Sequence, residues 1–324
     1  MSVVSTPAPP TGATDPPTLT VVPARHPWRW VGSAVALVLA AQFTHGLVTN
    51  PGWDWPTFAG YFVERSIVEA LLVTLHLTLA GAALGFLGGV VLAPMRLSRS
   101  PVLRGFSWTY IWVFRSVPLI VQLLFWANLG YLYDTLQFGV PFGPGFVEVR
   151  TIDLVSPFGA ALLGLTLHQA AYSAEIVRAG IISVDQGQVE AAAALGIPRL
   201  RQFRRIVLPQ AMRAILPSAA NELINLLKST SVVYVLAIGE IFYQVQVVYG
   251  RNGRVVPLLM VATVWYVVLT ALLSVLQFYV ERHFARGALR TLPPTPLQRL
   301  RAVVGQRLGR TGVAGPSRGG GGPW

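Results

Sequence analysis

The stretch EAAAALGIPRLRQFRRIVLP, residues 190–209, lies between two long apolar segments in the middle of the chain. Its first residues are strong helix formers, Gly196 suits a helix C-terminal cap, and Pro198 suits the first turn of a new helix. The second half is crowded with arginines, and Pro209 is expected to end it. The stretch therefore predicts two short helices joined by a hard turn.

The two short helices differ in character. We expect the first to begin at Asp185, which with Gln188 resembles a capping box. The second is amphipathic, with four apolar side chains on one face: Leu200, Phe203, Ile206 and Val207. An amphipathic helix lying on lipid headgroups explains the second helix but not the Ala-rich first one. Small residues allow close approach by another protein, so we favour a docking element for a cytosolic partner.

The chain around this stretch is strongly apolar. Of its 324 residues, 53% are hydrophobic and 12% are charged, against the quarter or so that is usual in soluble domains. Several apolar runs reach about 20 residues, enough to cross a bilayer as a helix. We predict a polytopic, all-α membrane protein. Cysteine is absent, which excludes disulfides and thiolate chemistry.

Six membrane spans are predicted from the apolar runs, after a first segment rich in Pro, Thr and Ala. They cover approximately residues 28–48, 67–93, 108–133, 157–181, 215–242 and 256–280. The second is expected to end at Pro94. A loop rich in Gly and Pro, reaching about Ser156, follows the third.

The charges predict the orientation of these spans. With six spans, the main arginine clusters fall on one side, which the positive-inside rule assigns to the cytoplasm. These clusters comprise Arg25 and Arg29; Arg96, Arg99 and Arg104; Arg199, Arg201, Arg204, Arg205 and Arg213; and Arg282, Arg286 and Arg290. We expect a multi-pass protein of a prokaryotic plasma (inner) membrane with both termini in the cytoplasm. The net charge of +12 then reflects membrane orientation, and no nucleic-acid partner is expected.

The central stretch resembles the signature loop of permease subunits of binding-protein-dependent ABC importers. The family pattern is Glu-Ala-Ala, three residues, Gly, nine residues, then Ile-x-Leu-Pro. Every fixed position is matched here, by Glu190, Ala191, Ala192, Gly196, Ile206, Leu208 and Pro209.

Other segments resemble the polar amino acid branch of that family, the histidine, glutamine and glutamate type. They include VFRSVPLIVQLLF from Val113, AYSAEIVRAGIISVDQGQVEAAAALG from Ala171 and NLLKSTS from Asn225. The likeness covers roughly residues 66–284. This chain departs from the branch pattern at residues 115–118, 168–169 and 228–231, so the resemblance does not identify the solute.

The resemblance implies a type I ABC importer permease fold with one extra N-terminal span. It also implies a non-enzymatic subunit that works with a second permease subunit, identical or different, with ABC ATPase subunits and with an extracytoplasmic solute-binding protein. The coupling helix should centre on residues 186–196, with Gln188 included in the coupling surface. No Gly-x-x-x-x-Gly-Lys-Ser/Thr motif occurs, so we expect no cofactor in this chain, with ATP and magnesium bound by the partner ATPase.

The expected domain organisation has four parts. Residues 1–26 form a disordered cytoplasmic tail, and residues 27–65 form the extra span with its external loop. Residues 66–284 form the permease domain, with the coupling loop at 182–214. Residues 285–324 form a basic disordered tail near membrane lipid.

Polar residues inside the predicted spans are candidates for the solute pathway. Asn221, Asn225 and Lys228 share a face of the fifth span, with Ser229 beside them, and Lys228 lies about 20 Å along the span. A lysine at that depth should face a partner or a wet cavity. It could contact the solute carboxylate or form a gate between subunits. Alternatively, it could pair with an acid such as Glu222 or Glu240, or lie outside the pathway. His168 and Gln169 could line the pathway or be satisfied by packing.

A salt bridge is expected between Glu175 and Arg178, one turn apart, and Arg115 could join it. We find neither metal-ligand spacing nor a Ser/His/Asp arrangement. A secondary transporter or channel driven by ion gradients is the alternative function, although it leaves the Glu-Ala-Ala loop unexplained.

Overall fold

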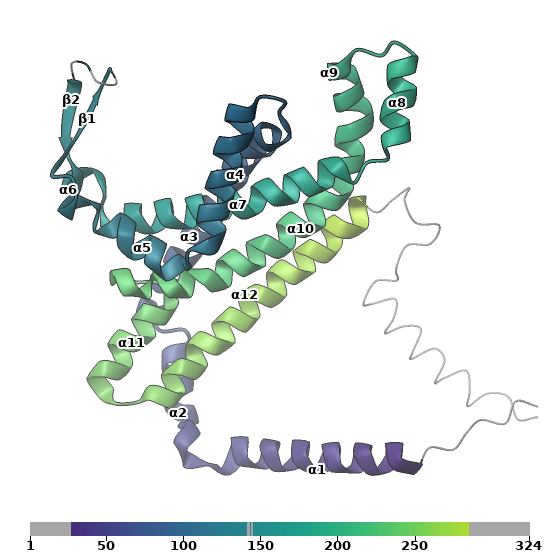
Figure 1. Cartoon of the computed structure of the whole chain (residues 1–324). Coiled ribbons are helices and arrows are strands. Elements are labelled where there is room, and N and C mark those ends of the chain that lie inside the picture. The colour runs from purple at the N-terminus through teal and green to yellow at the C-terminus, as the bar shows by residue number, and fades with distance from the viewer. Residues whose placement is uncertain (1–26, 141–142, 144, 285–324) are drawn as a thin grey trace, which may run out of the picture. The chain divides into compact units, whose positions relative to one another are not determined.

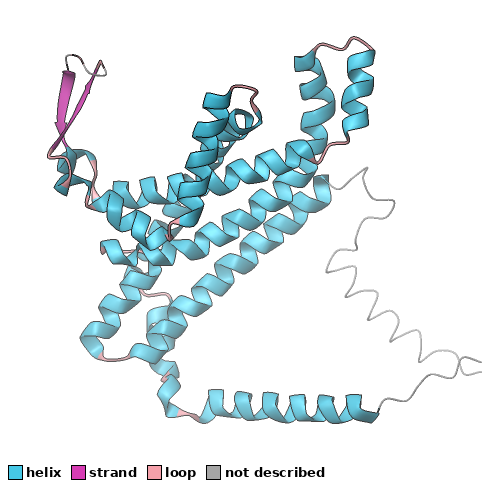
Figure 2. Ribbon diagram, in the orientation of Figure 1, coloured by secondary structure: helices cyan, strands magenta, loops and turns pink. Residues whose placement is uncertain are grey.

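The computed structural model describes residues 27–140, 143 and 145–284 (Figure 1). Both predicted tails, 1–26 and 285–324, lie outside the described residues. The chain divides into two compact units, Met1–Trp53 and Asp54–Trp324. In the described parts of both units helices dominate, and the strands seen there form one hairpin of the second unit (Figure 2).

The first unit contains α1 (Pro27–Thr49) and the short 3-10 helix η1 (Pro51–Trp53). Residues 30–49 of α1 are long and apolar enough to cross a membrane, and none of them is buried within the protein. An apolar helix whose side chains are not buried by the protein is suited to lipid. This helix corresponds closely to the first predicted span.

The second unit begins with α2 (Trp55–Phe62) and α3 (Arg65–Leu97). The carboxylate of Asp54 caps α2 by accepting the backbone N–H of Thr57 at 3.4 Å. The prediction that the second span ends at Pro94 is wrong, because α3 continues through that proline to Leu97. Membrane helices tolerate an internal proline where neighbouring groups compensate for its missing N–H.

The predicted third span is not one straight helix. The helix axis bends by 103° between α4 (Pro101–Ser116) and α5 (Leu119–Ala127). Pro118 causes the break, because the residue before a proline avoids the helical region, and Val117 is extended. The buried amide of Gln122 holds the bend by donating to the carbonyls of Phe114 (2.9 Å) and Val117 (2.8 Å).

The predicted Gly- and Pro-rich loop contains regular structure. After η2 (Leu129–Tyr131), strands β1 (Thr135–Gly139) and β2 (Gly145–Arg150) pair antiparallel with Thr135 opposite Arg150. The short helix α6 (Thr151–Leu154) follows, and the Thr151 hydroxyl donates to the carbonyl of Tyr133 at the base of the hairpin.

Helix α7 (Pro157–Ile182) corresponds to the fourth predicted span and packs against α3, α4, α5 and α10. The α3–α7 pair is the most extensive helix contact in the described part of the chain. Gly85 of α3 makes it close, because a Cβ there would lie 2.5 Å from Cβ of Gln169. Small residues at such contacts let membrane helices approach each other.

The predicted fifth span is also broken. Helix α10 (Leu208–Ser229) passes into η4 (Thr230–Leu236), and α11 (Ile241–Asn252) follows at a bend of 47°. The fully buried carboxylate of Glu240 caps α11 by accepting the N–H groups of Phe242 (2.9 Å) and Tyr243 (2.7 Å). Helix α12 (Val255–Phe284) then corresponds to the sixth predicted span.

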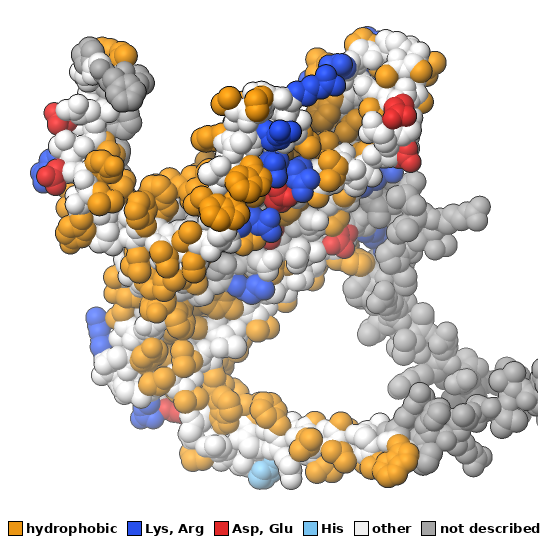
Figure 3. All heavy atoms as spheres, viewed as in Figure 1, with side chains coloured by type: hydrophobic (Ala, Val, Ile, Leu, Met, Phe, Trp, Pro, Cys, Tyr) orange, Lys and Arg blue, Asp and Glu red, His pale blue; other side chains and the backbone are white. Residues whose placement is uncertain are grey.

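Three of the described helices, α1, α3 and α12, are long and apolar enough to cross a membrane, and the two bent pairs raise this number to five. Helix α7 has the length but carries His168, Gln169, Glu175 and Arg178. Large apolar side chains cover much of the visible surface of the second unit (Figure 3). These features confirm a polytopic helical membrane protein.

Candidate functional site

The segment between α7 and α10 forms a helical hairpin, in the upper right of Figure 1. It contains α8 (Gln186–Ala194), α9 (Arg199–Gln202) and the π-helical turn η3 (Phe203–Val207). Helices α8 and α9 lie side by side. The predicted pair of short helices with a hard turn is therefore present.

The first helix begins and ends through local backbone chemistry. Asp185 caps it by accepting the N–H of Gly187 at 2.7 Å. The capping-box prediction is wrong in its second half, because the amide oxygen of Gln188 instead accepts a hydrogen bond from Gln210 at 2.6 Å. At the C-terminal end Gly196 has φ +69°, a conformation that favours glycine.

The second helix does not end at Pro209 as predicted. The helical path is continuous from α9 through η3 into α10, and Pro209 lies in the first turn of α10. A proline inside a helix lacks one N–H and crowds the carbonyl four residues earlier, and the π turn just before it accommodates both effects. The predicted apolar face is divided, because Val207 is buried whereas Leu200 and Phe203 are exposed.

Two glutamines tie the hairpin together. The side-chain amide of Gln202, which is 8% exposed, donates to the carbonyl of Val189 and so joins α9 to α8. The amide of Gln210 donates to Gln188 and, at 3.0 Å, to the carbonyl of Ile206. Sequence reasoning included Gln188 but missed Gln202 and Gln210, because their partners depend on the register of the two helices.

The exposed face of α8 combines alanines and a glycine with a few polar side chains. Glu190 and Ala191 are exposed, Ala192 is buried against the rest of the hairpin, and Leu195 is 79% exposed. Nothing lies within 4 Å of a Cβ built on Gly196. Leu208 and Pro209 are also exposed, and Ile206 is half-buried. The hairpin therefore presents an open face, and the short side chains leave its backbone accessible.

The polar residues of α10 lie along its second half. Asn221 and Lys228 are exposed, and Asn225 and Ser229 are half-buried. The Asn225 amide donates to Glu222 at 3.4 Å, and the Ser229 hydroxyl donates to the carbonyl of Asn225 at 2.9 Å. The Tyr266 hydroxyl donates to Glu240 at 3.0 Å, so both candidate acids for Lys228 have other partners. Among the described residues, Lys228 has no ion-pair partner.

His168 and Gln169 have different surroundings in α7. His168 Nδ1 lies 3.3 Å from the Gln122 amide at the α4–α5 bend, and its ring packs 4.9 Å from Tyr172. The buried Gln169 donates to Ser173 at 3.2 Å and borders a mainly apolar cavity of about 360 Å³. Residues of α3, α10 and α12 line the same cavity. Of the two, only Gln169 lines a cavity together with α10.

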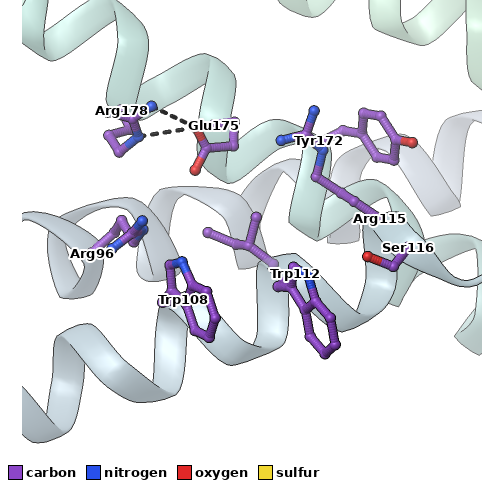
Figure 4. Close-up of a pocket in the computed structure, with 9 residues that line it drawn as sticks. Arg96, Trp108, Trp112, Arg115, Ser116, Tyr172, Glu175 and Arg178 are labelled. Atoms are coloured by element: carbon purple, nitrogen blue, oxygen red, sulfur yellow. Dashed lines mark hydrogen bonds and ion pairs between the residues drawn. The ribbon is translucent and has the colours of Figure 1, made fainter.

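The charged cluster of α7 lies near its C-terminal end. Glu175 accepts two hydrogen bonds from Arg178, at 2.6 and 3.0 Å. The guanidinium of Arg115, from the end of α4, lies 5.2 Å from the ring centre of Tyr172. All four side chains line a cavity of about 440 Å³ (Figure 4). No group of His, Cys, Asp and Glu in the described residues has the arrangement of a metal site.

Comparison with known proteins agrees with this arrangement. Residues 85–286 match the family described as binding-protein-dependent transport system inner membrane component. The arginine transport system permease protein ArgU of Corynebacterium glutamicum is 42% identical over 299 residues, covering 90% of this chain and 91% of that protein. The glutamate/aspartate import permease protein GltK of Escherichia coli O6:H1 is 34% identical over 221 residues, covering 68% of this chain and 93% of that protein.

A solved structure, the crystal structure of an amino acid ABC transporter with histidines, has a TM-score of 0.58 and 32% identity. It covers 67% of this chain and 94% of the other. The matched region includes α7, the α8–α9 hairpin and α10. The chain belongs to the family of inner-membrane components of binding-protein-dependent transport systems, and it is a multi-pass permease subunit.

Proposed function

We propose that this permease moves a polar amino acid across a prokaryotic plasma membrane, driven by ATP hydrolysis in a separate subunit. The observation that carries the proposal is the α8–α9 hairpin. It exposes Glu190, Ala191 and Gly196 at the end of α8 and joins α7 directly to the helix that continues into α10. Movement of the hairpin would therefore be transmitted to α7 and α10, which are two of the four helices that border the membrane cavity.

Coupling requires a docking face and a rigid connection. The open face of α8 supplies the first, because short side chains let a groove of the ATPase approach the backbone closely. The hydrogen bonds of Gln202 and Gln210 supply the second, because they fix α8 to α9 and to the start of α10. Ile206 lies in the π turn, and Leu208 and Pro209 begin α10 directly after it, where motion of the hairpin would enter the membrane helix.

The solute class rests on the relatives and on α10. Relatives named for arginine and for glutamate/aspartate transport share a third or more of their aligned residues with this chain. Lys228 offers a cation that could meet an α-carboxylate, and Asn221, Asn225 and Ser229 offer neutral hydrogen-bonding groups nearby. His168 is held at the α4–α5 bend, so Gln169 is the better candidate from α7 for lining the pathway.

The remaining parts of the proposal follow from the charge distribution and the family. Both termini lie in the cytoplasm, a second permease subunit completes the pathway, and an extracytoplasmic binding protein delivers the solute. ATP and magnesium bind only the ATPase. Residues 66–284 form the permease domain, with its coupling loop at 182–214 and the extra span and external loop at 27–65.

Gly196 provides the test. Gly196→Val forces a β-branched residue into a left-handed backbone conformation, which strains the turn between α8 and α9. We expect at least a tenfold loss of ATP-driven amino acid uptake in proteoliposomes containing the complete transporter, with assembly of the permease in the membrane unchanged.

Two further variants separate backbone strain from a change of size. Gly196→Asn should retain most uptake, because asparagine tolerates the left-handed region better than other residues. Gly250→Val in α11 is the matched control, since its backbone is unstrained and its Cβ would meet nothing within 4 Å. Normal uptake by Gly196→Val would contradict the coupling assignment.

A further inference from the structure

The cavity shown in Figure 4 carries an excess of positive charge. Arg96 from α3, Arg115 from α4, and Arg178 from α7 line it, with Glu175 as the single acid among the lining residues. Arg178 is paired with Glu175. Within the described residues, neither of the other two arginines has an ion-pair partner: Arg115 lies over the Tyr172 ring, and the buried Nε of Arg96 has no hydrogen-bond partner there. The cavity is therefore suited to an anion.

Two tryptophans border the same cavity on α4. Trp108 and Trp112 are stacked with ring centroids 6.1 Å apart, and they are 49% and 58% exposed. Figure 4 shows both rings pointing the same way, away from the arginine and glutamate pair. Val102 and Phe106 of α4 are also largely exposed. Half-exposed tryptophans beside apolar residues are typical of the boundary between lipid chains and headgroups.

In the proposed orientation the cavity lies at the level of the cytoplasmic leaflet of the membrane. Arg96 is the second-last residue of α3, and Arg178 lies four residues, about 6 Å, before the end of α7. Both helix ends lie on the side of the basic loops, which is the cytoplasmic side in the proposed orientation. Anionic phospholipid headgroups line that face of a membrane, and basic pockets between helices bind them.

We propose that this cavity binds the headgroup of an anionic phospholipid from the cytoplasmic leaflet. The phosphate lies between Arg96 and Arg115, where two guanidinium groups offer charge-assisted hydrogen bonds. The acyl chains lie along Trp108, Trp112 and the apolar face of α4. A free phosphate would use the same arginines but would leave the tryptophan face unoccupied.

Native mass spectrometry of the complete transporter tests the proposal. The probes are palmitoyl-oleoyl-phosphatidylglycerol, its phosphatidylcholine counterpart and inorganic phosphate, each titrated separately. We expect phosphatidylglycerol to bind and the other two to bind weakly. Arg96→Gln/Arg115→Gln should weaken phosphatidylglycerol binding roughly 20-fold, since each basic residue near an anionic surface contributes about a factor of five.

The matched control removes the same charge from the same region. Arg99→Gln/Arg104→Gln alters two arginines that do not line the cavity, and it should leave most of the binding intact. If the glutamine pair fails to fold, Arg96→Lys/Arg115→Lys keeps both charges. It should retain binding that falls steeply with added salt.

Three results would overturn the proposal. The first is equal phosphatidylglycerol binding by the cavity variant and the wild type. The second is lipid binding that does not depend on headgroup charge. It would show as phosphatidylcholine binding as tight as phosphatidylglycerol binding, or as phosphatidylglycerol binding that does not change with salt. The third is displacement of the lipid by inorganic phosphate or a free amino acid at matched concentration, which would assign the cavity to a soluble anion. None of these readouts requires transport, so the lipid site can fail while the proposed function stands.

Discussion

The α3–α7 contact and the α8–α9 hairpin show two opposite uses of small residues. In α3, Gly85 and Gly89 lie against the backbone of α7, and a Cβ at Gly89 would come within 2.7 Å of the Ala174 nitrogen. In the hairpin, Ala191 of α8 and Gly196, two residues after its end, are exposed, and a Cβ at Gly196 would meet nothing within 4 Å. Small side chains therefore allow close helix packing at the α3–α7 contact, whereas on the hairpin they leave an exposed face.

The difference lies in what covers each surface. Lipid cannot drive helices together hydrophobically, so the membrane core relies on close packing, which small residues permit. Within the described residues, the outer face of the hairpin has no such packing, and hydrogen bonds of Gln202 and Gln210 help to hold the shape of the hairpin. Substitutions in the first region should therefore act on stability, and those in the second on coupling.

The largest effect is expected in the packed region. Gly85→Val places a Cβ 2.5 Å from Cβ of Gln169, an atom fixed to the α7 backbone, so the helices must separate. Overpacking of this kind costs about 3 kcal/mol. Thermal unfolding of the purified transporter in detergent should show a clearly lowered midpoint. Gly105→Val on α4, where a Cβ meets nothing within 4 Å, is the control and should unfold near the wild-type temperature.

An intermediate effect is expected inside the hairpin. Gln202→Leu leaves the carbonyl of Val189 without its side-chain donor, at a cost of about 2 kcal/mol confined to the α8–α9 contact. ATP hydrolysis should continue while the amount of solute moved per ATP falls severalfold. Measuring both in the same proteoliposomes checks this. Gln42→Leu, exposed on α1 and not part of the hairpin, is the control and should behave as wild type. An unchanged ratio in Gln202→Leu would contradict the rigid connection.

The smallest effect is expected at the opposite end of the second unit. The side-chain hydrogen bond from Thr57, assisted by the Arg254 guanidinium 2.5 Å away, lowers the pKa of Asp54 below its ordinary value. A carboxyl with a lowered folded-state pKa stabilises the fold above its unfolded pKa, and this contribution is lost as pH falls through the folded value.

Asp54→Asn should therefore lower the unfolding temperature slightly at neutral pH and have almost no effect in strong acid. Unfolding scans of both proteins across this range test the sign. If the difference in unfolding temperature between the two proteins stays constant with pH, the charge of Asp54 is not the cause of the destabilisation.

The sequence predicts straight helices well and bends poorly. Helices α1, α7 and α12 lie close to their predicted positions, because each is a single apolar run with polar or proline-rich ends. The breaks at Pro118 and before Glu240 lie inside runs that stay apolar, so hydropathy continues across them. Side-chain hydrogen bonds in the folded structure hold these breaks. The Gln122 amide holds one bend, and the buried Glu240 carboxylate holds the other.

The α8–α9 hairpin could be predicted in outline for a different reason. Its helix formers, Gly196 and Pro198 act locally, so their spacing alone places the turn. The glutamine bonds, the π turn before Pro209 and the hairpin β1–β2 depend on which segments meet in space. Lys228 is an intermediate case: its depth along α10 follows from the sequence, whereas its lack of an acidic partner within the described residues needs the structure.

The central claim, that the open face of α8 docks on an ATPase subunit, is tested most directly by site-specific photo-crosslinking. Benzoylphenylalanine would replace Leu195, which is 79% exposed at the end of α8, or Tyr131, which is 90% exposed at the other end of the permease fold. Illumination of the assembled transporter should link position 195, and not position 131, to the ATP-binding subunit, as identified by mass spectrometry. Capture of that subunit from position 131 alone, or equally from both positions, would contradict the account.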